Sequence, residues 1–143
     1  MKKKLPLAVI ALGIAASVGF ANAASHADPV TARMELMKTI GAQAKILGTI
    51  AKGEYDAAAV SAAVTTLHDA ALQIPTAFET NATNAESEAL PKIWEDFSGF
   101  TAKAEGLQAA SMTAMNVTDA ASLGAAMGEI GGACKACHSN YRK

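Results

Sequence analysis

Five consecutive residues near the end of the chain have the types and spacing needed to attach a metalloporphyrin covalently. They are Cys134, Lys135, Ala136, Cys137 and His138, which read C-x-x-C-H, the attachment signature of a c-type haem. Each thiol can add across one haem vinyl group to form a thioether, and the adjacent imidazole can bind the iron as its proximal ligand. On a helix, the two cysteines and the histidine would share one face, because residues three and four apart are neighbours. The motif therefore predicts one covalently bound haem c.

Three other interpretations of the motif fit less well. A dithiol redox pair normally accompanies a βαβ pattern, and the sequence shows no strand pattern. A structural zinc site needs four ligands, whereas the chain has two cysteines, and its remaining histidines, His26 and His68, stand far apart. A disulfide between Cys134 and Cys137 would leave the adjacent histidine unexplained. Haem attachment accounts for all three residues of the motif.

The first 23 residues are typical of a secretory leader. A basic start, with lysines at positions 2–4, precedes an apolar run at 5–20 and an A-x-A cleavage site at 21–23. The apolar run is shorter than the ~20 residues of a membrane-spanning helix. We therefore expect a cleaved signal peptide over 1–23 and a mature domain over 24–143. That domain should be periplasmic, the compartment that suits covalent haem attachment, and free of the membrane after cleavage.

The net charge of the mature chain limits the classes of partner that it can bind. Three of the 12 basic residues lie in the leader, whereas all 13 acidic residues follow it. The mature domain is therefore acidic, which argues against nucleic acid as a partner because nucleic-acid binders carry basic patches. The domain is rich in alanine and poor in aromatic residues, so a large apolar cofactor would help to fill its core.

Helical spacing of apolar residues predicts four helices that position the motif. The first opens at Asp28 and Pro29 and stops near Gly53, and the second opens near Asp56. Pro75 is expected to end the second helix. A third helix should run from Leu90–Pro91 to about Asn116, and a fourth should start at Thr118 or Asp119 and carry the motif. Four helices with mostly short connections predict an all-α, antiparallel four-helix bundle.

Four stretches in this order resemble the class II cytochromes c, the cytochrome c′ family. Arg33–Lys38 is similar to the family's R-x-x-x-M-K start, and Ile50–Asp56 is similar to its first turn. Pro91–Phe97 with Phe100 matches the third helix, and Cys134–Arg142 matches the C-x-x-C-H-x-x-Y/F-R ending. The resemblance covers essentially the whole mature chain and implies the four-helix fold with one haem c.

The resemblance also implies roles for individual residues. Cys134 and Cys137 would hold the haem, with His138 as its proximal ligand. Arg142 would lie near the proximal face and Arg33 near the haem propionates, although each could equally be a solvated surface charge. Three aromatic residues would surround the bundle core, with at least one of them against the haem, or would simply be core: Trp94, Phe97 and Phe100.

Met37 distinguishes the two branches of the family that the sequence resembles. The position four residues after the first-helix arginine faces the distal side of the iron. High-spin members leave the iron five-coordinate behind an apolar residue, whereas low-spin members place a methionine thioether there as the sixth ligand. A methionine at helical spacing is also often plain core. The sequence around Met37 and the turn at 50–53 look more like the low-spin branch, so we expect both His138 and Met37 to bind the iron.

Two functions follow from these alternatives. His/Met ligation raises the reduction potential of haem and would suit a carrier of electrons between redox partner proteins. A five-coordinate haem would instead bind NO or CO. An enzyme is not expected, because no acid–base residue is evident on the first-helix face. The family also suggests a homodimer through the first two helices, for which small residues on the first helix would allow close packing: Gly41, Ala44, Gly48 and Ala51.

Overall fold

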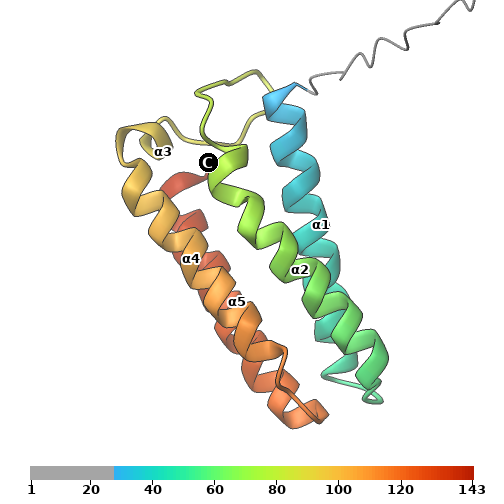
Figure 1. The fold of residues 1–143 in the computed structure, drawn as a ribbon. Coiled ribbons are helices and arrows are strands. Elements are labelled where there is room, and N and C mark those ends of the chain that lie inside the picture. The colour runs from blue at the N-terminus through green and yellow to red at the C-terminus, as the bar shows by residue number, and fades with distance from the viewer. Residues whose placement is uncertain (1–27) are drawn as a thin grey trace, which may run out of the picture.

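The computed structural model describes residues 28–143, so the predicted leader and His26 lie outside the described residues. The helices in chain order are α1 (Pro29–Ile50), α2 (Ala57–Ala77), α3 (Lys92–Glu95), α4 (Phe97–Ala114) and α5 (Ala120–Tyr141). The four long helices run alternately down and up, so that the start of α1 and the end of α5 lie at the same end of the bundle (Figure 1). The predicted antiparallel four-helix bundle is confirmed.

Three of the long helices, α1, α2 and α5, begin where capping residues predict them to begin. Asp28 accepts a hydrogen bond from the backbone N–H of Thr31, and Pro29 occupies the first helical turn. Asp56 caps α2 in the same way. Asp119 and Ser122 form a reciprocal capping box at the start of α5. These side chains satisfy amide groups that have no partner within the helix.

The prediction that Pro75 ends the second helix is wrong, because α2 continues to Ala77. Proline has no N–H, so the carbonyl of Ala71 loses its partner within the helix. The side-chain amide of Gln108 on α4 donates to this carbonyl at 3.3 Å. A donor from the neighbouring helix thus replaces the missing backbone bond, and α2 passes through the proline.

The predicted third helix is two helices, α3 and α4, separated at Asp96 with φ −133° and ψ 59°. One carboxylate oxygen of Asp96 accepts from the backbone N–H of Gly99 at 3.1 Å and caps α4. The other accepts from the Tyr141 hydroxyl at 2.9 Å. A Cβ at residue 99 would clash with this carboxylate, so the cap depends on glycine. Local side-chain bonding of this kind competes with a continuous helix.

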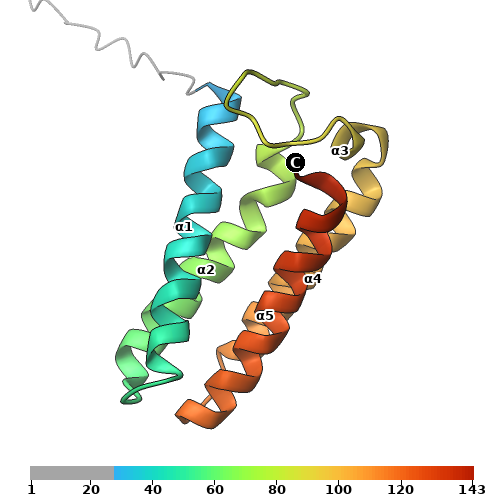
Figure 2. The same cartoon turned by 180° about the vertical axis from the view of Figure 1, so that it is seen from behind.

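The core is built from aliphatic side chains and many alanines. Fully buried residues are contributed by four helices: Leu47, Leu67, Ile93, Leu123 and Ile130. Helix α1 packs on α2, α2 on α4 and α4 on α5, whereas α1 and α5 touch each other less. Figure 2 presents this less tightly packed side, with α1 and α5 in front. Within residues 28–143, no helix is long and apolar enough to cross a membrane.

The bond between Gln108 and Ala71 yields a stability prediction. Gln108→Met should lower the free energy of unfolding by about 1 kcal/mol, because the fully buried Ala71 carbonyl is left without a donor. In a Pro75→Ala background the new backbone N–H can serve this carbonyl, so the same substitution should cost clearly less. Chemical denaturation of the four proteins of this cycle measures both effects. An equal cost in both backgrounds would contradict the compensation.

Candidate functional site

A cavity of about 590 Å³ lies on the side of the bundle where α1 and α5 are less tightly packed. Its volume falls in the range of small-molecule and cofactor pockets. Its wall includes Met37 on α1 and all three residues of the motif on α5, Cys134, Cys137 and His138. Apolar side chains from the core complete much of the wall: Val30, Ile40, Ile74, Phe78, Ile93, Phe100 and Leu107. The fold therefore brings the motif and the predicted distal residue to one cavity.

The three residues of the motif lie on the last turns of α5. Both cysteines are free and half-buried, and burial raises the pKa of each thiol. His138 is exposed as a residue, but partial desolvation of its imidazole lowers its pKa, with a further contribution from Arg142 that Glu88 opposes. A lowered pKa keeps the imidazole neutral, the form in which histidine binds a metal. Two thiols and a neutral imidazole on one helix are the donor set that a covalent haem requires.

The α1 wall of the cavity carries two methionines. Met37 is half-buried and packs against the core, as its helical spacing predicts. Met34, one turn earlier, also lines the cavity and was not among the predicted site residues. Residues three apart share a helix face, so the sequence contained this signal. The cavity thus has two thioethers on the helix opposite the motif.

Arg33 is almost completely buried, with 3% of its surface exposed. Its Nε donates to the carbonyl of Ala77 at 2.9 Å and its Nη1 to that of Ala82 at 2.8 Å. Its Nη2 donates to the carbonyl of Thr80. Burial lowers the pKa of Arg33, although nearby Asp28 opposes the shift. Arg33 borders the cavity where propionates were predicted, but each guanidinium nitrogen already donates to a carbonyl at the last residue of α2 or in the segment after it.

Two aromatic rings flank the same guanidinium. Its central carbon lies 4.9 Å from the ring centre of Phe78 and 5.2 Å from that of Trp94. The indole N–H of Trp94 donates to the carbonyl of Phe78 at 2.8 Å, which fixes α3 against the end of α2. Stacking and carbonyl bonds together make Arg33 a clamp between α1, α2 and α3.

One of the three aromatic residues singled out in the sequence lies in the cavity wall. Phe100 lines the cavity, whereas Trp94 and Phe97 are absent from its wall among the described residues. The break at Asp96 explains this difference, since it places Trp94 on α3 under Arg33 and Phe97 at the start of α4, where it stacks on Phe100 at 6.0 Å. Phe78, which was not among the predicted site residues, takes a place in the wall.

The segment before α3 is tied to the end of α5, beside His138. Arg142 forms an exposed ion pair with Glu88. The backbone N–H of Leu90 donates to the carbonyl of Tyr141 at 2.9 Å. The backbone N–H of Lys143 donates to the backbone carbonyl of Glu88, also at 2.9 Å. Arg142 and Glu88 both line the cavity, so Arg142 lies near the histidine as predicted. Glu88 lies in a polar loop, and nothing in its sequence pattern marks it.

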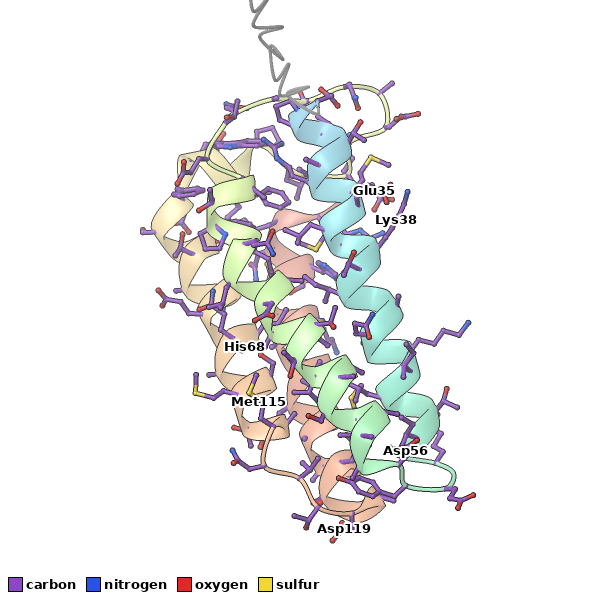
Figure 3. The ribbon with its side chains drawn as sticks, turned by 45° about the vertical axis from the view of Figure 1, so that its right-hand side comes forward. Glu35, Lys38, Asp56, His68, Met115 and Asp119 are labelled. Atoms are coloured by element: carbon purple, nitrogen blue, oxygen red, sulfur yellow. The ribbon has the colours of Figure 1, made fainter. Side chains whose placement is uncertain are left out.

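His68 takes no part in this site. Its Nδ1 lies 2.9 Å from the Ser111 oxygen, between α2 and α4. The Ser111 hydroxyl donates to the carbonyl of Gln108 at 2.8 Å, so its oxygen is left to accept from the histidine. Figure 3 shows His68 on α2, facing α4. Over residues 28–143, no three histidine, cysteine or acidic side chains gather as a metal site would require.

These features define the class of protein. An antiparallel bundle presents C-x-x-C-H on its last helix to a largely apolar cavity. In the described part of the chain, every buried side-chain nitrogen or oxygen atom has a hydrogen-bond partner. The residues present therefore fit a covalent haem c. The family model described as Cytochrome C′ matches residues 28–142. The chain belongs to the cytochrome c′ family, whose cofactor is haem c.

Relatives with two different names support this assignment. The chain is 41% identical over 115 residues to cytochrome c-556 of Agrobacterium tumefaciens, which covers 78% of this chain and 91% of the relative. It is 34% identical to a cytochrome c′ of Rhodopseudomonas palustris, over 97% of each chain. The solved structure of cytochrome c′ from R. palustris superposes with a TM-score of 0.75 at 32% identity, covering 81% of this chain and 96% of that chain.

The clamp formed by Arg33 yields a prediction about stability. Arg33→Lys keeps the positive charge but cannot serve three carbonyls or stack as a planar group. We expect it to lower the free energy of unfolding by about 2 kcal/mol, within the range for hydrogen bonds to a charged group. Denaturation of the haem-loaded protein, followed by circular dichroism, measures the loss. An unchanged stability would show that only the charge of Arg33 matters, as a role towards propionates alone would require.

Proposed function

We propose that this protein is a periplasmic electron carrier with one haem c, attached to Cys134 and Cys137 and ligated by His138 and Met37. The observation that carries the proposal is the placement of Met37 on α1 and of the motif on α5 in the walls of one cavity. The predicted leader supports the compartment. When bound, the haem supplies an iron that gains or loses one electron.

The residues of the chain would serve this function in distinct ways. His138 would donate through its neutral imidazole, and the neutral thioether of Met37 would favour the reduced iron and raise the reduction potential. The apolar wall around Met37 would keep water from the iron. Arg33 lies one turn before Met37 and Tyr141 one turn after Cys137, and both are held by buried or partly buried hydrogen bonds. These anchors would limit movement of the ligands between oxidation states.

Gas binding is the second candidate function. The apolar wall near Met37, which includes Val30 and Ile40, favours it because a small apolar gas could occupy that space. Met37 has a flexible thioether side chain that can either bind the iron or pack against this wall. The two functions therefore differ in what Met37 does.

Two methionines on the same wall provide a matched test. Met37→Ala should convert a low-spin haem to a high-spin one, lower the reduction potential and allow rapid binding of CO. Met34→Ala removes an equivalent side chain one turn away and should leave spin state and potential close to those of the wild type. Redox titration and CO mixing, monitored by absorption, measure these properties.

The reverse pattern would identify Met34 as the ligand. If neither substitution changes the potential, or if the wild type already binds CO rapidly, then Met37 is core and gas binding becomes the leading function.

A further inference from the structure

Charge is distributed unevenly between α1 and the rest of the described chain. Over residues 29–52, four basic residues accompany a single acidic one, Glu35. Over residues 53–143, acidic residues outnumber basic ones more than twofold. An acidic domain therefore carries one basic helix. Such asymmetry creates a local field that can steer a charged partner.

The lysines of this helix lie on one line at intervals of seven residues. Lys38, Lys45 and Lys52 share a face because seven residues make almost two helical turns, and Ala51 keeps helical dihedrals just after α1. Gly41 and Gly48 lie between the lysines on the same line. We call these five residues the lysine seam. All three lysines are exposed. Lys38 pairs with Glu35 at 2.6 Å, and Figure 3 shows the two side by side on α1, so Lys45 and Lys52 carry most of the net charge of the seam.

The seam has a low profile between its charges. A Cβ built at Gly41 or Gly48 would meet no atom within 4 Å, so the surface beside the glycines is open. A shallow concavity on the outer face of α1 is lined by Lys45, Lys52 and small neighbours between and beside them. A partner can therefore approach the α1 backbone closely while its acidic groups meet the lysines on either side.

The N-terminal end of the seam borders the cavity. Lys38 and Gly41 of the seam also line the cavity. Their α1 neighbours Met37 and Ala44 line it as well. Lys103 on α4, another exposed lysine, lines the cavity as well. A protein docked on the seam would thus lie beside the place that the haem fits. Electron transfer requires this proximity, and electrostatic complementarity mainly raises the rate of encounter.

A second copy of the chain is a poor occupant of this face. In a two-fold dimer that pairs the seams antiparallel about Lys45, each lysine would face a lysine of the partner, because isologous contacts repeat the same patch on both sides. Two of the small residues on α1, Ala44 and Ala51, are partly buried against the core of the bundle. The seam itself therefore favours an acidic protein over a second copy of the chain.

We propose that the lysine seam is the docking surface for an acidic redox protein, which exchanges electrons with the haem across the adjacent cavity. This inference rests on the proposed electron-transfer function and names the chemistry of the partner and the face that it uses. The hydroquinone of flavodoxin, a small acidic electron carrier, serves as the probe. In the measured step the anionic hydroquinone loses one electron to become the neutral semiquinone, and the ferric haem becomes ferrous.

The test compares two variants with the same change in net charge. Lys45→Gln/Lys52→Gln removes two positive charges from the seam. Ser61→Glu/Thr65→Glu adds two negative charges at exposed positions on the side of α2 that carries His68 and faces α4. Both pairs are surface substitutions, which usually change stability little. Redox titration checks that the variants and the wild type have equal reduction potentials. Any change in the second-order rate of reduction then reflects the rate at which the two proteins meet.

We expect the seam variant to lower the second-order rate of reduction by flavodoxin about tenfold at low ionic strength, whereas the α2 variant stays within about twofold of the wild type. High salt should remove the difference by screening the charges. Equal slowing in both variants, no slowing in either, or failure of flavodoxin to reduce the wild type would overturn the docking surface. Rapid CO binding by the wild type would instead overturn the electron-transfer function, whatever the flavodoxin rates show.

Discussion

The arrangement of this bundle depends on how the buried guanidinium of Arg33 is satisfied. A charged group removed from water is costly unless it is hydrogen-bonded, and Arg33 bonds to carbonyls at the last residue of α2 and in the segment after it. These bonds join the N-terminal part of α1 to α2 and, through Trp94, to α3. At the same end, Tyr141 joins the last turn of α5 to Asp96, between α3 and α4. The two helices that line the cavity from opposite sides are thus fixed to one small region.

These anchors allow α1 and α5 to pack loosely against each other without loss of order. Each of these two helices is supported by a neighbour, since α1 packs on α2 and α5 packs on α4. An apolar space can then remain between the walls, large enough for a cofactor and lined by Met37, the two thiols and His138. Small alanine side chains keep the remaining helices close together. A bound haem would supply the apolar surface that these alanines do not.

Local chemistry explains which features the sequence could predict. The C-x-x-C-H motif, the capping aspartates and the helical period each act within a few residues, so the bundle, the starts of α1, α2 and α5 and the motif on one cavity-facing helix were predictable. Pro75 was misread because its effect is decided by a partner distant in sequence, Gln108. The break at Asp96 was missed because it combines a local cap on Gly99 with a bond to the distant Tyr141. Arg33 was predicted at the cavity, but its carbonyl partners lie 44 to 49 residues away. Glu88 enters the site only through the packing of a loop on the end of α5.

The proposed function requires the α1 and α5 walls to bind one iron from opposite sides, through Met37 and His138. The visible absorption spectrum of the reduced, haem-loaded wild-type protein tests it most directly, because six-coordinate low-spin and five-coordinate high-spin iron differ in this region. Ligation by Met37 predicts sharp, separate α and β bands. A single broad band would show that the iron has an open or weakly held sixth position and would contradict ligation by Met37.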